Sequence, residues 1–537
     1  MEHILLVEPE YNNKYPPIGL MKISTYHKNK GDYVEFYKGK APYNLIQKVD
    51  KVYITSLFTF YFEITVETIR HYMKYVSNEK IYFGGISATL MADRYIKETG
   101  IQNILKGQLF TSKMMGYDDD INVDVLPLDY DILDDVEYDY GISDNFFAHA
   151  TRGCPRKCQF CAVKTLEPVF CNTNNLIKQI EYVRTKFGDK RNIMMMDNNV
   201  IFSDKLQEIC DDLNAAGFVI NQPTYVPPNP AKLFFSKIER RDLTLNPTWH
   251  IVDKFISYLN KFINRIRNED ILNKITEILE QLRETDSKKQ ILINNKEFII
   301  AVVEKYRIKK PLQRYVDFNQ GLDARLLTEE KMRHLAKLPI KPFRLAYDEL
   351  KSTDEYIAAF ELAYKYGIRH FSNYMLYNFN DKPEELWQRM YNNIMLYMKY
   401  DDVAAFSFPM KYAPVDMIDR SYIGEHWNKK FLSAMNIILN VTKGVVAKEY
   451  DFFVRAYGHN KEEFIQILSM PNEFIKHRNF FEEHGFTEQW KHEFTLLNPE
   501  ERAEFIELLS SDKFDDKYSK LFYFYKITRN KVEKNLI

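Results

Sequence analysis

The chain has 537 residues, of which 45% are apolar and 15% aromatic, so it is long and hydrophobic enough to bury several cores. Its formal net charge of −1 excludes a strong overall field of the kind that attracts nucleic acids or anionic membranes. It has neither an apolar run long enough to cross a bilayer nor a signal-peptide pattern at the N-terminus, so we expect a cytoplasmic protein without membrane contact.

Strand and helix patterns alternate in the first part of the chain. Apolar runs at 3–8 and 51–60 predict buried strands, and the stretches 16–39 and 80–107 add helices, glycine turns and further strands. This alternation predicts an α/β fold with a doubly wound, Rossmann-like domain over residues 1–110.

An acidic connector, residues 111–145, follows this domain, and we expect it to be a solvated linker. A second alternating series covers residues 146–415. Its six strand–helix units predict a full or partial (β/α)6 barrel, in which chemistry takes place at the carboxyl ends of the strands. Residues 416–537 predict a C-terminal helical domain.

A helical insertion interrupts the second series at about 218–312. Residues 231–314 carry 18 Lys and Arg against 11 Asp and Glu, a formal charge of +7. Two alternatives stay open for this module: a solvated scaffold or lid, or an electrostatic contact with an anionic substrate or nucleic acid, although the module has no nucleic-acid motif.

Three of the five cysteines, Cys154, Cys158 and Cys161, lie within eight residues of one another, directly after a predicted strand. Their Cys-x3-Cys-x2-Cys spacing allows three thiolates to face one centre. A structural zinc site normally has four ligands, whereas three thiolates on a [4Fe–4S] cluster leave one iron open for a small molecule. A zinc knuckle and incidental thiols are the alternatives. We expect Cys171 and Cys210 to be buried thiols.

The stretch "RGCPRKCQFC" resembles the cluster-binding loop of radical S-adenosylmethionine (radical SAM) enzymes. The resemblance implies that Cys154, Cys158 and Cys161 hold a [4Fe–4S] cluster and that S-adenosylmethionine chelates the fourth iron. An electron supplied by a donor such as flavodoxin or ferredoxin would then produce a 5′-deoxyadenosyl radical. Phe160 matches the aromatic residue of the family loop, and it either packs beside the adenine or fills the loop core.

The same resemblance places polar residues at the ends of the later strands. Where the family has Gly-Gly-Glu, this chain has "MMMDNN", so its Asp and Asn residues are the candidate acceptors for the methionyl amine. Arg325 either pairs with the cofactor carboxylate or forms an internal bridge with Asp323. The predicted cofactor-binding residues are Asp197, Asn198, Gln320, Asp323, Arg325 and Asp348, with Asn199 and Glu349 beside them and Lys411 and Tyr412 toward the substrate.

Residues 1–110 resemble the cobalamin-binding domain of a large radical SAM subclass, through "PPIGLMKIS", "YITSLFTFYF" and "FGGISATLM". Gly84 and Gly85 would allow close approach of a ligand or a neighbouring helix, and Ser87 and Thr89 would bond a cofactor tail. The Asp-x-His-x-x-Gly motif is absent, so two alternatives stay open: cobalamin without a lower histidine ligand, or a domain without the cofactor.

We therefore expect a radical SAM enzyme with one cluster, because no cysteine precedes Cys154 and none follows Cys210. If cobalamin binds, methyl transfer is the expected reaction. The alternatives are a non-catalytic iron–sulfur redox-sensing or binding scaffold, and a radical enzyme that modifies nucleic acid or protein without cobalamin. The substrate is not encoded in any motif.

Overall fold

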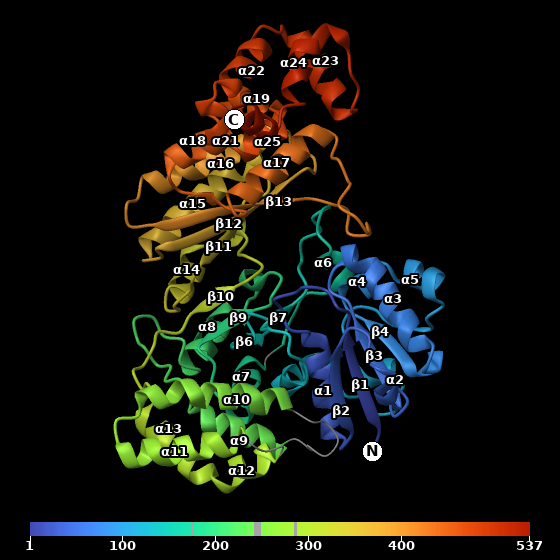
Figure 1. Ribbon diagram of the computed structural model, residues 1–537, viewed down its shortest axis with the longest axis vertical. Coiled ribbons are helices and arrows are strands. Elements are labelled where there is room, and N and C mark those ends of the chain that lie inside the picture. The colour runs from blue at the N-terminus through green and yellow to red at the C-terminus, as the bar shows by residue number, and fades with distance from the viewer. Residues whose placement is uncertain (174, 241–248, 284–286, 537) are drawn as a thin grey trace. The chain divides into compact units, whose positions relative to one another are not determined.

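The computed structural model describes residues 1–173, 175–240, 249–283 and 287–536 (Figure 1). The contacts within the chain divide it into two compact units. The first contains residues 1–319 and 337–340, and the second contains residues 320–336 and 341–537.

The first unit begins with a parallel sheet of order β2-β1-β3-β4-β5. Its strands are β1 (His3–Glu8), β2 (Tyr33–Lys38), β3 (Lys51–Thr55), β4 (Ile81–Gly84) and β5 (Asn103–Leu105). The four apolar residues of β1, Ile4 to Val7, have no exposed surface. Such a continuous apolar run is typical of a parallel strand that is covered on both faces. The predicted doubly wound sheet is confirmed, although the strand expected at 51–60 ends at Thr55.

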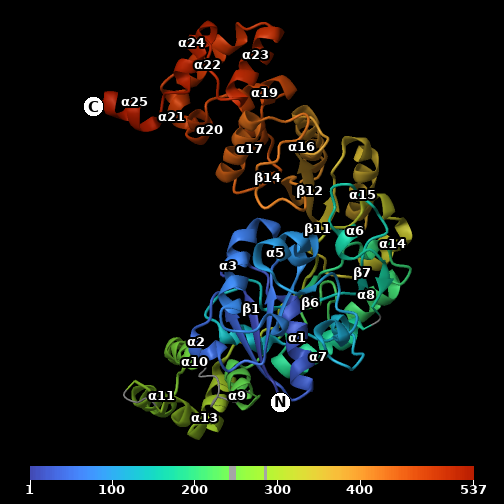
Figure 2. The same ribbon diagram turned by 90° about the vertical axis from the view of Figure 1, so that its right-hand side faces the viewer.

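Helices cover both faces of this sheet. They are α1 (Ile18–Asn29), α2 (Tyr43–Ile46), α3 (Phe62–Met73), α4 (Ile86–Leu90) and α5 (Ala92–Thr99). In both ribbon views α1 lies on the opposite side of β1 from α3 (Figures 1 and 2). The carboxyl ends of the strands therefore form one edge of a covered sheet, and the amino ends form the other.

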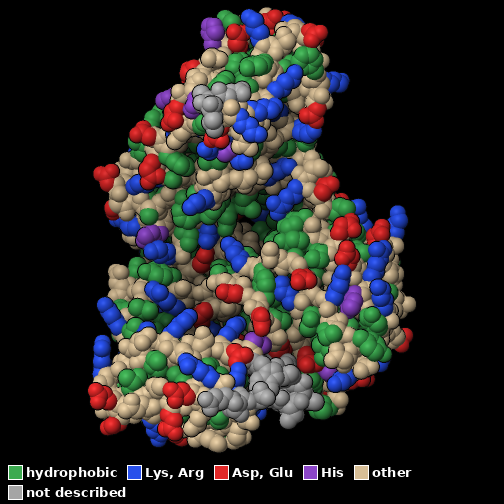
Figure 3. Space-filling model, viewed as in Figure 1, with side chains coloured by type: hydrophobic (Ala, Val, Ile, Leu, Met, Phe, Trp, Pro, Cys, Tyr) green, Lys and Arg blue, Asp and Glu red, His purple; other side chains and the backbone are tan. Residues whose placement is uncertain are grey.

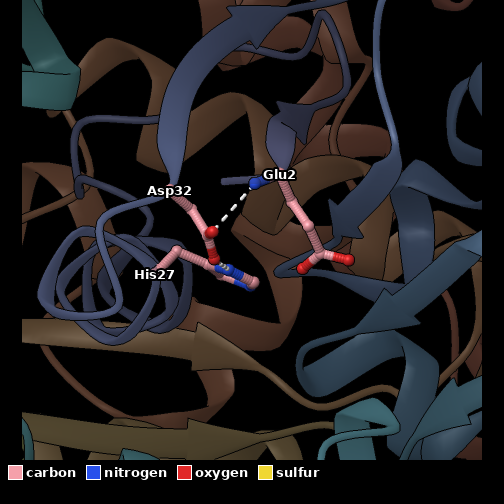
Figure 4. A group of neighbouring side chains, drawn as sticks. All are labelled: Glu2, His27 and Asp32. Atoms are coloured by element: carbon pink, nitrogen blue, oxygen red, sulfur yellow. Dashed lines mark hydrogen bonds and ion pairs between the residues drawn. The ribbon is translucent and has the colours of Figure 1, made fainter.

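A hydrogen-bonded cluster closes the amino edge (Figure 4). The Asp32 carboxylate accepts from the Glu2 backbone N–H at 2.9 Å and pairs with His27 Nδ1 at 2.8 Å. These residues and Glu2 bring one potential metal-ligand atom each within 4.8 Å of one another. His27 Nε2, however, lies 3.2 Å from the Tyr53 hydroxyl, and Glu2 accepts from Tyr117 at 2.6 Å. The ring nitrogens and the carboxylates thus already have protein partners, and the cluster ties β1 to the start of β2.

The acidic connector is not a solvated linker, which corrects the sequence interpretation. Asp129 and Asp131 are 1% and 3% exposed. Asp129 accepts from Ser24 at 2.6 Å and pairs with Lys28 at 2.6 Å, and Asp131 pairs with Arg240 at 2.9 Å. Buried carboxylates need such partners, so the acidic run supplies internal ion-pair partners to its neighbours.

A second parallel sheet of order β10-β9-β6 completes the framework of the first unit. Its elements are β6 (Asn145–Ala148), α7 (Leu176–Phe187), β9 (Asn192–Met195), α8 (Leu206–Ala215) and β10 (Val316–Phe318). A short antiparallel pair, β7 (Thr151–Arg152) and β8 (Cys171–Asn172), flanks the cysteine loop and its helix α6 (Val163–Leu166).

The predicted insertion is helical, as expected, although its residues 241–248 and 284–286 lie outside the described ranges. Its helices are α9 (Pro230–Arg240), α10 (Trp249–Phe262), α11 (Glu269–Gln281), α12 (Lys288–Asn294) and α13 (Lys296–Tyr306). They share an apolar core in which the rings of Phe234 and Phe255 stack at 3.9 Å. Several cations of the module pair with carboxylates, for example Lys237 with Asp134 at 2.7 Å. This internal pairing reduces the charge that is available to an anionic partner.

The second unit contains the other strands of the alternating series. They are β11 (Phe343–Ala346), β12 (His370–Tyr377) and β13 (Ala404–Lys411), which are parallel, and the antiparallel β14 (Val446–Ala447). The helices of this series are α14 (Glu329–Leu335), α15 (Thr353–Lys365) and α16 (Pro383–Met398). The predicted parallel strands are therefore present, but they belong to two sheets, and their closure into one barrel stays a prediction.

The expected C-terminal helices follow in the same unit. They are α17 (Lys429–Val441), α18 (Tyr450–Tyr457), α19 (Lys461–Ser469), α20 (Asn472–Lys476), α21 (Arg478–Glu483), α22 (Phe486–Thr495), α23 (Pro499–Ser510), α24 (Ser519–Phe524) and α25 (Arg529–Leu536). Trp490 and Phe505 are fully buried among them. No helix in the described ranges combines the length and the hydropathy that a bilayer span requires. The domain boundaries expected from the sequence stay predictions.

We expect Gly85→Ala to lower the free energy of unfolding by at least about 1 kcal/mol more than Gly100→Ala, because Gly85 occupies a region of backbone space that is nearly exclusive to glycine. Gly85 has φ 100° and ψ −175°, and a Cβ atom there would lie 2.6 Å from the Ser56 carbonyl oxygen. Gly100 also has a positive φ, but nothing lies within 4 Å of its Cβ position. Urea unfolding of both variants measures the difference, and equal losses would contradict the packing argument.

Candidate functional site

The cysteine loop brings three cysteine thiols together in one short segment. Cys154, Cys158 and Cys161 are each partly buried and none forms a disulfide. The Cys161 backbone N–H donates to the Cys158 carbonyl at 3.2 Å, so the last two cysteines lie on one turn. The pairing of Arg152 with Cys171 closes the loop at its base. Cys171 is itself exposed, which corrects the expectation of a buried thiol, whereas Cys210 is buried as predicted.

Gly153, directly before the first cysteine, is needed where the chain enters the loop. It has φ +74°, and a Cβ atom there would lie 2.2 Å from the Val169 carbonyl oxygen. Its backbone N–H donates to Glu167 Oε2 at 2.7 Å. Only glycine lets the two ends of the loop approach this closely.

An ion-pair network fastens this entry point to the N-terminal sheet. Arg152 pairs with Asp124 at 3.0 Å and with Glu167 at 3.1 Å, and each of these side chains is less than 15% exposed. Lys22, on α1, reaches the same Asp124 carboxylate at 3.2 Å. The network thus joins α1, the acidic connector and both ends of the cysteine loop.

Asp197, at the end of β9, also supports the loop. Its Oδ1 accepts from the backbone N–H groups of Ala150 and Thr151 at 3.0 and 2.5 Å, and from the Thr151 hydroxyl at 2.7 Å. Its Oδ2 is buried and has no hydrogen-bond partner among the described residues. Burial raises the pKa of Asp197 to about 6, in spite of these three donors. The residue holds the strand before the loop and keeps one oxygen available to a donor.

The two asparagines that follow take different partners. Asn198 donates to Glu167 at 2.8 Å. Asn199 donates to the Cys154 sulfur at 3.4 Å, and its buried Oδ1 has no partner in the described part of the chain. The structure therefore brings the predicted "MMMDNN" residues to the cysteine loop, and Asn199 makes the direct contact. Phe160 lies partly buried within the loop.

His149 is a residue of this region that the sequence analysis did not select. It directly follows β6, and its backbone groups bond Gln179 and Thr173. Burial, with the nearby cations of Arg152 and Lys22, lowers its pKa well below the usual range, so the imidazole is neutral at pH 7. Its position directly after a strand was the available signal.

Other predicted site residues belong to the second unit. Gln320 is exposed. Arg325 bonds Asp323 through Nε at 2.8 Å and Nη2 at 3.2 Å, so the structure contains the internal bridge that was one of the two alternatives. Asp348 accepts from the Leu376 backbone N–H at 3.3 Å, and burial raises its pKa.

Arg389 organises the same strand ends and was missed, because a single arginine on a predicted helix is normally exposed. It is fully buried and donates to the carbonyls of Asp348 and Leu376, each at 2.8 Å. Lys411 donates to the Arg420 carbonyl at 2.6 Å, and the Tyr412 ring packs against Phe379 at 4.7 Å. These expected substrate-facing groups thus also have protein partners.

At the carboxyl edge of the N-terminal sheet, the residues expected to bind a cofactor tail bond the protein instead. Ser87 is buried and lies 2.7 Å from the Tyr95 hydroxyl. The Thr89 hydroxyl donates to Gly85 at 3.0 Å and accepts from Gly107 at 2.9 Å. Gly84 packs against Leu105, so the close approaches at the glycine pair come from neighbouring backbone and side chains.

The same edge presents apolar side chains to solvent. The Phe58 and Phe60 rings stack at 5.0 Å just after β3, and Phe58 and Ile86 are 37% and 38% exposed. We call these three residues the apolar edge. Helix α4, which carries Ile86, packs against α6 of the cysteine segment, and the two helices lie side by side in Figure 1.

The chain was compared with protein families, curated proteins and solved structures. No family model matches the chain, and no curated protein matches it. The structure is similar to that of the radical S-adenosylmethionine methyltransferase TsrM from Kitasatospora setae, solved with cobalamin and a [4Fe–4S] cluster bound. The identity is 12%, the match covers 77% of each chain, and the TM-score is 0.44.

We expect Asp197→Asn to remove a pH dependence of stability. Because the pKa of Asp197 is about 6 in the fold and about 3.9 in an unfolded chain, the folded state binds the proton more tightly. Stability from this residue is therefore complete below pH ~4 and falls by roughly 3 kcal/mol as the pH rises through 6. Urea unfolding of the metal-free protein from pH 4 to 7 measures this loss against the variant, with the exposed Asp211→Asn as control. A difference between Asp197→Asn and the parent chain that does not change with pH would contradict the assignment.

Proposed function

We propose that this protein is a radical S-adenosylmethionine enzyme in which Cys154, Cys158 and Cys161 hold a [4Fe–4S] cluster. The observation that carries the proposal is the set of three partly buried cysteine thiols, none in a disulfide, on one loop. Three thiolates suit a cluster with one open iron better than a four-ligand structural zinc site. When bound, the cluster would supply the electron that cleaves S-adenosylmethionine, and a flavodoxin or ferredoxin is the proposed donor.

The residues around the loop support this donor set. Asn199 donates to the Cys154 sulfur, which favours the thiolate that a metal centre requires. Glu167 accepts from the Gly153 backbone N–H and Asp197 from the Thr151 backbone N–H, so the chain directly before the first thiol is held in place before any ligand binds. Asp197 Oδ2 and Asn199 Oδ1, which have no partner in the described ranges, are acceptors for a ligand that carries N–H groups, such as the amine of S-adenosylmethionine.

We further propose cobalamin-dependent methyl transfer, with the corrin ring against the apolar edge. Exposed aromatic rings at the carboxyl edge of a doubly wound sheet offer a flat apolar surface where such folds bind ligands. The packing of α4 against α6 places that surface next to the cysteine segment, as transfer between two cofactors requires. In this proposal the ring contacts replace the cofactor-tail role that we expected for Ser87 and Thr89.

Anaerobic reconstitution with iron and sulfide tests the cluster. We expect the parent chain and the Cys171→Ala control to gain about four irons per chain and a charge-transfer absorbance. With S-adenosylmethionine and dithionite, both should release 5′-deoxyadenosine. Replacing Cys154, Cys158 or Cys161 by Ala should abolish the absorbance and the product, because each removes one of the three thiolate ligands.

The readouts separate the alternatives. An intact cluster spectrum without 5′-deoxyadenosine would favour a non-catalytic redox or binding scaffold. A chain that shows no cluster absorbance after reconstitution and holds one zinc ion would favour a zinc knuckle.

Titration with hydroxocobalamin tests the second part. We expect a saturable change in the corrinoid spectrum for the parent chain, and affinity at least about tenfold lower for the Phe58→Ala/Phe60→Ala double variant, because two ring contacts are lost. Tyr75→Ala removes a ring that is 45% exposed elsewhere on the domain and is the control. A parent chain that forms 5′-deoxyadenosine and does not bind the corrinoid would support radical chemistry without cobalamin.

A further inference from the structure

The C-terminal helices enclose a pocket of about 560 Å³. Its walls come from α17, α18, the junction of α20 with α21, and the first residue of α25. This volume lies within the range of pockets that bind small organic molecules. All of its lining residues follow β13 in the chain, so none of them belongs to the cysteine loop or to the strand ends described above.

One part of the pocket wall is apolar. The lining includes apolar side chains from α17, α18 and the α20–α21 junction, namely Ile438, Val441, Phe452, Ala456, Ile475 and Phe480. Val441 and Phe452 remain 56% and 39% exposed. An apolar body placed against them would remove this surface from water, which favours binding by roughly 25 cal/mol per Å².

The rest of the wall is cationic. Arg455, Lys476, Arg478 and Arg529 line the pocket together with His477, against one carboxylate, Glu483. In the space-filling view, Lys, Arg and His side chains gather over α21 and α25 (Figure 3). Cations grouped around an apolar wall fit a ligand that has both an anionic group and an apolar body.

The pairing of these cations shows which of them can receive an anion. Arg455 and Arg529 already bond carboxylates, Glu482 at 2.9 Å and Glu533 at 2.7 Å. Arg478 is 15% exposed, and its ion pair with Glu482 is 4.0 Å long, well beyond a charge-assisted hydrogen bond. Within the described part of the chain, Lys476 has no carboxylate at ion-pair distance.

We propose that this pocket binds an amphipathic organic anion, with Lys476 and Arg478 receiving the anionic group and the apolar wall receiving the body. The proposal is independent of the function assigned to the cysteine loop. It assigns a ligand site to the C-terminal helices, which otherwise have no role in the proposed chemistry.

The test is a binding titration of the full chain by calorimetry with decanoate below its micelle concentration. Decan-1-ol and decylamine have the same apolar body without the negative charge. We expect decanoate to bind with a stoichiometry of one, more weakly as salt is raised, and at least about tenfold more tightly than either analogue. Decyl phosphate and 8-anilinonaphthalene-1-sulfonate then show whether the site prefers another anionic group or an aromatic body.

Variants locate the site. We expect Lys476→Gln and Arg478→Gln each to weaken decanoate binding by about tenfold, because each removes one charged hydrogen-bond donor. Lys513→Gln/Lys520→Gln removes two exposed cations from the same unit and should leave the affinity unchanged. Arg478 is partly buried, so its replacement can also destabilise the fold, and its affinity is interpreted only if the variant unfolds at the same temperature as the parent chain. Lys476 is exposed, so the Lys476→Gln variant tests the proposal without an effect on folding.

Equal binding of decanoate and decan-1-ol would overturn the proposal, and so would unchanged affinity of the Lys476→Gln variant. Removing the iron–sulfur cluster should not change the result. A chain that lacks the cluster and still binds decanoate therefore separates failure of the proposed enzymatic function from failure of this site.

Discussion

The ion-pair network of Asp124, Arg152 and Glu167 is the constraint on which the rest of the first unit depends. It lies where the acidic connector, helix α1 and the cysteine loop meet, with each member mostly shielded from water. Charges buried in this way add little net stability, but the loss of one partner leaves the others unpaired at a cost of about 3–5 kcal/mol. The network therefore acts mainly by specifying one arrangement of the loop against the N-terminal sheet.

The polar residues that follow β9 contact the same loop segment. Asp197 and Asn199 are buried, and each has one oxygen with no hydrogen-bond partner among the described residues, which is unfavourable in a protein core. In the proposed function, the bound S-adenosylmethionine supplies the missing hydrogen-bond donors. Burial of the carboxylate also raises the pKa of Asp197. The three hydrogen bonds that Asp197 accepts from Ala150 and Thr151 hold the backbone before the loop.

The pattern of the sequence was sufficient for local features. Strand–helix alternation predicted the doubly wound sheet, and the Cys-x3-Cys-x2-Cys spacing predicted the loop, because both depend on residues close together in the chain. The acidic connector was misinterpreted since charge composition does not show that Asp129 and Asp131 meet Ser24, Lys28 and Arg240 from distant segments. Arg389 was missed because an arginine on a helix is normally exposed, and the carbonyls of Asp348 and Leu376 that bond it come from other segments of the chain.

By itself the sequence determined the α/β elements, the three clustered thiols and the absence of cysteines that a second cluster would need. Only the tertiary structure decided which polar residues are available to a ligand. Ser87, Asn198 and Arg325 sit where a motif comparison places binding groups, yet each bonds another residue of the protein. Asp197 and Asn199 keep a buried acceptor instead. The physical reason is that a hydrogen-bond partner is chosen by proximity in space, which local sequence patterns do not encode.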